Sequence, residues 1–177
     1  AGAEALRPKL GPYCYGDGDA DLAAVVLDLL AAQGAHLAVA ESCTGGIIGQ
    51  RLTNVPGSSR VFSGGVIAYD NDVKMHVLGV SAETLAEHGA VSEVVAREMA
   101  EGVARILGAE AALAVTGIAG PSGAVPGKPV GTVWIGVSWR GQVRAFTHVL
   151  PGSREAVRRR AAQWALDYLR RIVSGLM

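Results

Sequence analysis

Apolar residues recur with the spacing of an amphipathic helix in three parts of the chain. From Leu22 to Leu30 they fall at i, i+3, i+4, i+7 and i+8, which places them on one helical face. A second run covers residues 94–107 and follows Ser92, a residue type that commonly caps a helix N-terminus. A third begins at about Arg154. The pattern therefore predicts a helix in each of these segments.

Shorter apolar segments between turns rich in glycine and proline predict strands and short helices. Strands are expected at 36–40, 62–69, 111–116, 130–139 and 143–150, and short helices at 47–52, 71–78 and 82–88. Helices and strands alternate along most of the chain, and two strands then follow each other directly. This order favours a single three-layer α/β/α domain with a mixed, mostly parallel sheet.

The N-terminal residues carry no apolar period. Glycines and prolines interrupt residues 1–18, so we expect a flexible N-terminal extension there and a folded domain over residues 19–177. The alternating Asp17, Asp19 and Asp21 resemble the start of a calcium-binding loop, but the glycine and distal glutamate of that motif are missing. A solvated helix start, capped by Asp19 or Asp21, is the favoured interpretation.

Charge and cysteine content narrow the classes of function. Lys and Arg together number 16, as do Asp and Glu, a balance that argues against direct binding of nucleic acid. Two cysteines, Cys14 and Cys43, do not form a disulfide framework. No signal peptide and no apolar run long enough for a bilayer are seen. We therefore expect a cytoplasmic protein with no membrane partner, and the alanine-rich helices favour a homo-oligomer, most simply a dimer.

Three turns with reactive side chains each follow a predicted strand. They are Ala40-Glu-Ser-Cys-Thr-Gly-Gly46, Tyr69-Asp-Asn-Asp-Val-Lys74 and Thr116-Gly-Ile-Ala-Gly-Pro-Ser-Gly123. Loops at the carboxyl ends of neighbouring strands form the usual ligand crevice of α/β sheets. The first turn offers hydroxyl and thiol nucleophiles, and free N–H groups at a helix start could hold an anion or an oxyanion. The common placement of the turns predicts one shared site.

Each of these residues also has a simpler interpretation. The first turn could be structural, with Thr44 as a helix cap, and Cys43 could be a thiolate nucleophile or a small buried residue. Lys74 alone would more commonly be solvated. Arg154 and Arg158 lie one helical turn apart and could clamp a phosphate, although a solvated basic face is the commoner case. The four histidines show no metal-ligand spacing, so no metal is expected.

Six segments in one order resemble a known family. They are Ala40-Glu-Ser-Cys-Thr-Gly-Gly46, Pro56-Gly-Ser-Ser59, Tyr69-x-Asn71-x-x-Lys74, His88-Gly-Ala-Val-Ser-Glu93, Thr116-Gly-Ile-Ala-Gly-Pro121 and Lys128-Pro-Val-Gly-Thr132. Together, over about residues 20–173, they resemble the CinA C-terminal domain family of competence- and damage-inducible proteins. Each segment alone is weak, and the six in register are specific.

The resemblance implies a nicotinamide-nucleotide amidohydrolase, an NMN deamidase that acts on a carboxamide C–N bond. Such enzymes convert nicotinamide mononucleotide and water to nicotinic acid mononucleotide and ammonia in pyridine nucleotide salvage, without a cofactor. By motif match, Ser42 would be the nucleophile, Lys74 its base and Tyr69 a support. The implied substrate-binding residues are Thr44, Gly45, Gly46, Asn71, Thr116, Gly117, Arg154 and Arg158.

The sequence departs from the family pattern in a few places. Relatives often have Gly-Asp-Arg where this chain has Gly152-Ser-Arg154, and the loop at residues 123–127 is also unusual. Many relatives carry an N-terminal domain that resembles molybdopterin-binding proteins, and we expect no activity of that domain here. The alternative to an enzyme is a non-catalytic nucleotide-sensing or partner-binding module linked to competence or the DNA-damage response.

Overall fold

The computed structural model describes residues 9–177 and contains one mixed sheet. Its strands are β1 (Leu37–Glu41), β2 (Phe62–Ile67), β3 (Ala111–Gly117), β4 (Thr132–Trp139) and β5 (Gln142–Val149), in the order β2-β1-β3-β4-β5. β1 pairs in parallel with both β2 and β3, whereas β4 is antiparallel to β3 and to β5. Only β4 therefore opposes the common strand direction, which confirms the predicted mixed sheet.

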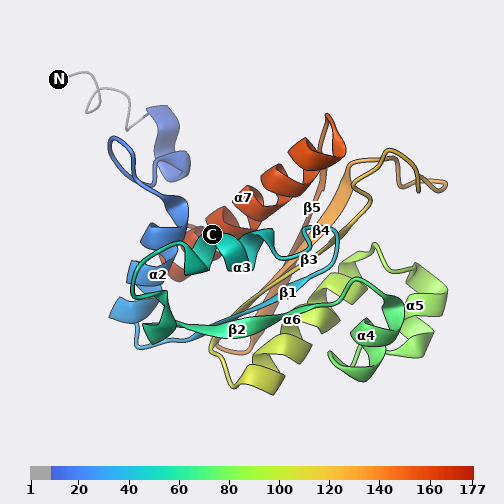
Figure 1. Ribbon diagram of the computed structural model, residues 1–177, viewed down its shortest axis with the longest axis horizontal. Coiled ribbons are helices and arrows are strands. Elements are labelled where there is room, and N and C mark those ends of the chain that lie inside the picture. Colours follow the sequence, from blue (N-terminus) through green and yellow to red (C-terminus); the bar gives the residue numbers. More distant parts are fainter. Residues whose placement is uncertain (1–8) are drawn as a thin grey trace.

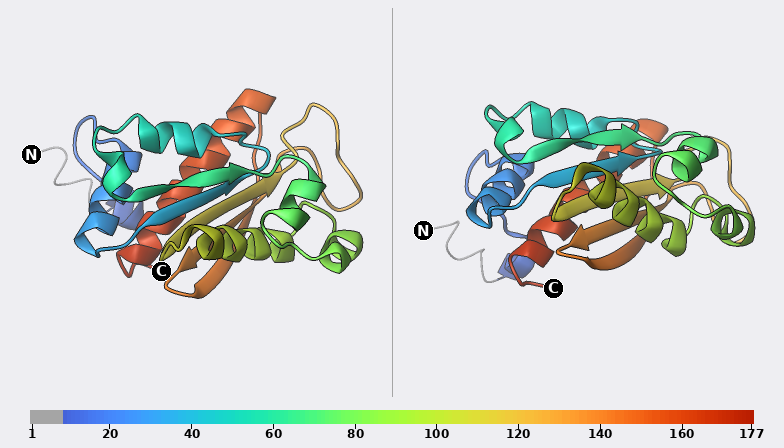
Figure 2. Two further views of the ribbon diagram at one scale, coloured as in Figure 1. Left: turned by 60° about the horizontal axis from the view of Figure 1, so that its bottom comes forward. Right: turned by 90° about the horizontal axis from the view of Figure 1, so that it is seen from below.

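Helices cover both faces of this sheet (Figures 1 and 2). One face carries α2 (Leu22–Ala32), α3 (Ile47–Thr53) and α7 (Arg154–Val173), and the other carries α4 (Asn71–His76), α5 (Ala82–His88) and α6 (Glu93–Leu107). Two 3₁₀ turns complete the described elements, at Gly11–Tyr13 and Ser58–Arg60. The predicted three-layer α/β/α architecture is confirmed.

Alternate residues of the central strands supply two separate cores. In β1, Leu37 and Val39 pack with α2, α3 and α7, whereas Ala38 and Ala40 face α6. The small residues on the second face let α6 approach closely. At Gly136 of β4, an added Cβ would lie 2.1 Å from the carbonyl oxygen of Ala96, so only glycine fits there. β1 is buried at every position, so the turn that follows it starts from a strand enclosed in the core.

Side chains that the sequence identified as helix caps occupy those positions. Asp21 accepts from the Ala23 N–H at 3.0 Å, and the Ser92 hydroxyl accepts from the Val95 N–H at 3.4 Å. Both bonds satisfy amides that the first helical turn leaves without a partner. The Ser92 hydroxyl also donates to the Gly89 carbonyl at 3.0 Å, and so ties the start of α6 to the preceding segment.

The segment from residue 9 to residue 18 lies against the C-terminal half of α7. Arg170 donates to the carbonyl oxygen of Pro12, and the Arg171 guanidinium lies 5.1 Å from the ring centre of Tyr13. Residues 1–8 lie outside the described residues, and the flexibility expected for residues 1–18 stays a prediction. No helix in the described part of the chain combines the length and the apolar character that a membrane span needs.

Candidate active site

The three predicted turns meet at one edge of the sheet. In the strand register, Glu41 lies between Ile67 of β2 and Val115 of β3, so β1 and β2 end level with one another and β3 ends two residues further, at Gly117. β4 begins at the same edge and β5 ends there, because Thr132 pairs with Val149. The N-terminus of α7 therefore also arrives at this edge (Figure 1). The turn after β1 is central because β1 lies between β2 and β3.

Glu41 caps helix α3 from the end of the preceding strand. Its side chain is 1% exposed, and Oε2 accepts from the N–H groups of Gly46 at 3.0 Å and Ile48 at 3.1 Å. Oε1 accepts from the Gly49 N–H at 2.8 Å. The α3 N-terminus was expected to offer free amides to a ligand anion, and for these amides the expectation is wrong. Their acceptor is already built into the protein.

The alternative in which Thr44 caps the helix is also wrong. The N-cap position is Gly46, which has no side-chain cap bond, and Thr44 lies before it. Thr44 is fully buried, and its Oγ1 has no hydrogen-bond partner among residues 9–177. A buried hydroxyl without a partner is uncommon in native proteins and calls for an explanation.

The turn itself leaves two amides open. Gly45 and Gly46 adopt positive φ angles of 59° and 103°, and the Gly45 N–H donates to the Ser42 carbonyl at 3.1 Å. The N–H groups of Cys43 and Thr44 have no backbone acceptor within the described residues. Ser42 is 8% exposed, and its hydroxyl makes no hydrogen bond within residues 9–177. A bound carbonyl group could meet these two amides.

Arg158 fixes the carbonyl side of the same turn. Its Nε donates to the Cys43 carbonyl at 3.0 Å and its Nη2 donates to the Thr44 carbonyl at 2.8 Å. Two of the nitrogens of this guanidinium therefore support the backbone next to Ser42. The sequence assigned Arg158 to a phosphate, and that assignment stays a prediction; in the structure its guanidinium bonds to the Ser42 turn.

Arg154 joins the other two turns to α7. Its Nη1 donates to the Gly120 carbonyl at 2.9 Å, and its Nη2 donates to the Tyr69 hydroxyl at 2.6 Å. Tyr69 follows β2 and is 59% exposed, so its ring lies at the surface of the site. These bonds connect the loops after β2 and β3, which are otherwise separate in the sequence.

A basic cavity of about 600 Å³ opens between α3 and α7. It is lined by Ile47, Gln50, Arg154, Glu155, Arg158 and Arg159. The volume lies within the usual range of small-molecule sites. Three guanidinium groups against one carboxylate give the lining a net positive charge, which suits a phosphate.

Lys74 is a buried amine in the segment that follows β2. It lies on α4, is 1% exposed and donates from Nζ to the Tyr69 carbonyl at 3.3 Å. Burial lowers the pKa of Lys74 below its ordinary value, and the Asp70 carboxylate opposes this effect. At a given pH, a larger fraction of the Lys74 amine is therefore neutral than in a solvated lysine.

Cys43 corresponds to the second of the two interpretations that the sequence allowed, a small buried residue. It is 5% exposed, and burial raises the pKa of its thiol to about 12, although the nearby Arg158 acts in the opposite direction. A thiol with this pKa stays protonated near neutral pH and is a poor nucleophile. Gly117 makes room for it, since an added Cβ there would lie 3.1 Å from Sγ and 2.9 Å from the Thr132 carbonyl oxygen.

The other predicted binding residues lie around this centre. Thr116 is 1% exposed, and its hydroxyl donates to the Ala90 carbonyl at 2.8 Å, so it anchors the segment before α6. Asn71 is exposed and opens α4 after the N-cap Asp70. Neither side chain bonds to the Ser42 turn in the described part of the chain.

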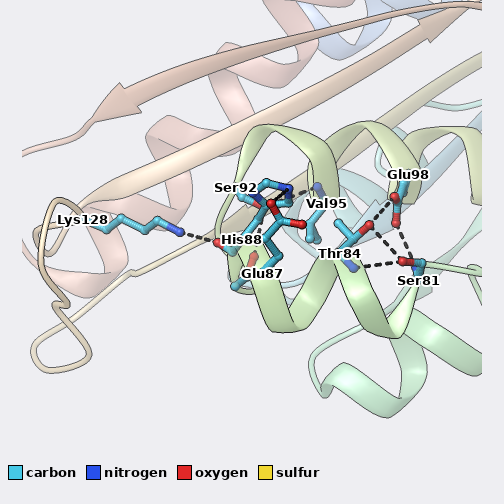
Figure 3. A network of polar contacts seen from close by, with 9 residues as sticks. Ser81, Thr84, Glu87, His88, Ser92, Val95, Glu98 and Lys128 are labelled. Atoms are coloured by element: carbon cyan, nitrogen blue, oxygen red, sulfur yellow. Dashed lines mark hydrogen bonds and ion pairs between the residues drawn. The ribbon is translucent and has the colours of Figure 1, made fainter.

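One tether that the sequence did not indicate lies beside the loop after β3. Lys128 donates to the carbonyl oxygen of His88 at 2.6 Å and so ties this loop to the end of α5 (Figure 3). At the other end of α5, Glu98 accepts from the Ser81 N–H at 2.9 Å and from the Thr84 hydroxyl at 2.7 Å. The helix is thereby held at both ends.

Comparison with known proteins agrees with this geometry. Residues 19–173 match the family described as the CinA C-terminal domain. A CinA-like protein of Gemmatimonas aurantiaca is 59% identical over 169 residues, which cover 96% of this chain and 40% of that protein. A CinA-like protein of Thermotoga maritima is 46% identical over 170 residues, covering 96% of this chain and 41% of that protein. The chain thus spans about two fifths of the length of the curated relatives it matches.

Solved structures match over most of their length. The competence damage-inducible protein A of Klebsiella pneumoniae gives a TM-score of 0.85 at 38% identity, over 88% of this chain and 97% of that one. A competence-damaged protein (CinA) superfamily protein from Escherichia coli gives 0.82 at 32% identity, over 91% of this chain and 97% of that one. Identity and fold therefore lead to the same family.

Proposed function

The chain belongs to the CinA C-terminal domain family, and on that premise we propose that it is a nicotinamide-nucleotide amidohydrolase. It would hydrolyse nicotinamide mononucleotide to nicotinic acid mononucleotide and ammonia, in pyridine nucleotide salvage. The observation that carries the proposal is Lys74, a buried amine with a lowered pKa in the segment after β2, the strand whose last residue pairs with Glu41 next to Ser42. Perturbed, buried titratable groups of this kind are typical of catalytic sites.

In the proposed reaction, Ser42 attacks the carboxamide carbon and Lys74 accepts its proton. The Oγ–C bond forms, the C–N bond breaks, and Lys74 delivers the proton to the departing nitrogen, which leaves as ammonia. Water then attacks the nicotinoyl ester, Lys74 takes a proton from it, and this proton returns to Ser42. Lys74 Nζ must turn from the Tyr69 carbonyl towards Ser42, as catalytic hydrogen bonds often tighten only when substrate binds.

The negative charge that develops on the carboxamide oxygen needs fixed donors. The N–H groups of Cys43 and Thr44 are suited to this, because they follow Ser42 directly and have no backbone acceptor within the described residues. Donors held in place before the reaction stabilise a transition state more than donors that must reorient. The bonds from Arg158 to the carbonyls of these same residues support such preorganisation.

The phosphate of the substrate would bind in the basic cavity between α3 and α7. Arg154 and Arg158 line it and also contact the loops around Ser42, so phosphate binding and the reacting centre share the same side chains. The carboxylate of Glu41 already occupies amides at the α3 N-terminus, which favours the arginines over that helix end as the phosphate site.

A cytoplasmic location belongs to the same proposal. The free thiols of Cys14 and Cys43 suit a reducing compartment. The homo-oligomer expected from the sequence stays a prediction.

Ammonia release tests the proposal directly. The purified protein should release ammonia from nicotinamide mononucleotide without added metal and equally in the presence of a chelator, and Ser42→Ala should remove nearly all of this activity. Folded protein that binds the mononucleotide but releases no ammonia would instead support the nucleotide-sensing alternative. Activity lost with chelator and restored by zinc would contradict the serine–lysine chemistry.

A further inference from the structure

Glu41 is a buried carboxylate next to the proposed nucleophile, and the mechanism above gives it no chemical step. We infer that Glu41 is a positioning residue that holds the turn carrying Ser42 in its reactive shape. The inference rests on the proposed function, because it assigns Glu41 a part in the reaction of Ser42. Its structural basis is a closed ring of contacts between the end of β1 and the first turn of α3.

Glu41 connects the residues on the two sides of the Ser42 turn. Glu41 is the last residue of β1, and its main chain pairs with both neighbouring strands. Its side chain reaches over the turn to the N–H groups of Gly46, Ile48 and Gly49, at 2.8 to 3.1 Å. The root of the turn and its far end are therefore joined through one side chain, and movement of α3 relative to β1 would break these bonds.

An ordinary helix cap does not restrain the turn before the helix in this way. A capping side chain normally belongs to the residue that flanks the helix and bonds only to the next few amides. Glu41 lies five positions before Gly46, with the Ser42 turn enclosed between the two. The same carboxylate that satisfies the helix thus limits the conformations of the turn. Arg158 holds the opposite, carbonyl side at Cys43 and Thr44, so the turn is restrained from two directions.

The chemistry of the contact requires a carboxylate. Three donors converge on two oxygens, and an ionised carboxylate presents acceptors only. The glutamine side chain has the same shape but carries one acceptor oxygen and an NH₂ group. In Glu41→Gln, at least one of the three amides would face another donor. The negative charge of the carboxylate at the α3 N-terminus would also be lost.

The test uses Glu41→Gln, with Glu98→Gln as the matched control. Glu98 also accepts a main-chain N–H and a second donor at a helix start, but it does so at α5 (Figure 3), whereas Glu41 bonds to α3. Thermal unfolding measures the loss of stability in both variants, and steady-state kinetics with nicotinamide mononucleotide separates kcat from KM. We expect Glu41→Gln to lower kcat about 100-fold with little change in KM, because a displacement of about 1 Å has an effect of this size.

The control sets the outcome that would overturn the inference. Glu98→Gln should lose stability as well but keep kcat within about twofold. If Glu41→Gln lowers kcat no further than Glu98→Gln, Glu41 is a structural cap and the positioning role is wrong. A large rise in KM at unchanged kcat would also contradict it, since a displaced nucleophile affects the chemical step.

A measurement on the unmodified protein keeps the inference testable if Glu41→Gln does not fold. In amide hydrogen exchange followed by NMR, the N–H groups of Gly46, Ile48 and Gly49 should exchange much more slowly than those of Cys43 and Thr44. Equal rates would show that Glu41 does not hold the turn. This result is independent of catalysis: protein with slow exchange but no ammonia release would refute the proposed function and leave the ring of contacts intact.

Discussion

Replacement of Lys74 by methionine should make the protein more stable and inactive at the same time. Methionine keeps the length of the side chain and removes the amine, which is 1% exposed and bonds only weakly, at 3.3 Å, to one carbonyl. Burial of a polar group without good compensation costs about 1–3 kcal/mol, whereas one hydrogen bond returns about 0.5–1.5 kcal/mol. We therefore expect Lys74→Met to raise the free energy of unfolding by about 1–2 kcal/mol near neutral pH.

The effect should depend on pH with a definite sign. Burial lowers the pKa of Lys74 in the folded state, whereas in the unfolded chain it lies at about 10.4. Between these two pKa values the unfolded state binds more protons, so the stability of the unmodified protein rises with pH. The advantage of Lys74→Met is therefore largest at low pH, where the buried amine is charged, and shrinks as pH rises through the folded pKa of Lys74.

Two assays test the stability and the activity that this prediction concerns. Denaturant unfolding from acidic to alkaline pH measures the stability difference, and a gain of 1 kcal/mol should raise Tm by about 2–4 °C in a protein of this size. The pH profile of kcat/KM on nicotinamide mononucleotide should rise with pH through one ionisation and disappear in Lys74→Met. Lys74→Arg is the control for charge, and it should also be inactive because a guanidinium stays protonated in this range.

Either of two results would contradict this prediction. A Lys74→Met variant that is less stable by a margin independent of pH would show that the amine is a structural group rather than a desolvated, titrating one. Near-normal turnover in Lys74→Arg would show that the cation acts electrostatically. The proton acceptor would then have to be another residue, and Tyr69, whose main chain already contacts Lys74, would be the first to examine.

Three further substitutions test the remaining groups. Cys43→Ala should keep a substantial part of the turnover that Ser42→Ala removes, because burial raises the pKa of the Cys43 thiol to about 12. If Cys43→Ala instead lost more kcat/KM than Ser42→Ala, the enzyme would be a thiol hydrolase. Arg154→Ala should weaken binding of the mononucleotide by about 1.5–3 kcal/mol and binding of its phosphate-free riboside much less. Equal losses of affinity for the two ligands in competition binding would exclude a phosphate contact. Thr44→Val should keep or raise Tm yet lower kcat/KM, whereas unchanged kinetics would leave its hydroxyl without a role.

Most of the fold was predictable because local patterns and the sheet agree. The predicted helices and strands are all present, and their ends differ by a few residues where turn geometry intervenes. The strand expected to begin at residue 130 begins at Thr132, because Gly131 has a φ of 93° and the Thr132 hydroxyl bonds to the Pro129 carbonyl. The strand expected to end at Tyr69 ends at Ile67, after which the chain turns towards α4.

The site was predictable only in its location. Turns that follow parallel strands meet at one edge, so the convergence of the three motifs follows from the fold class. The contacts between them do not follow. Arg158 and Cys43 lie 115 positions apart, and nothing in either segment indicates that a guanidinium meets that carbonyl. The motif did contain Glu41, but a glutamate at the end of a strand does not by itself reveal which amides it accepts from.

Two buried polar side chains of the candidate site lack good hydrogen-bond partners within residues 9–177. Lys74 and Thr44 are both buried, and each is poorly satisfied: one has a single long hydrogen bond, and the other has none among the described residues. Both lie in segments that follow strands ending at the same edge, Thr44 after β1 and Lys74 after β2. The buried side chains of Glu41 and Thr116, by contrast, make hydrogen bonds that hold loops. Because folding alone would favour apolar residues at poorly paired buried positions, this contrast separates Glu41 and Thr116, which hold the site, from Lys74 and Thr44, which are proposed to act on the substrate.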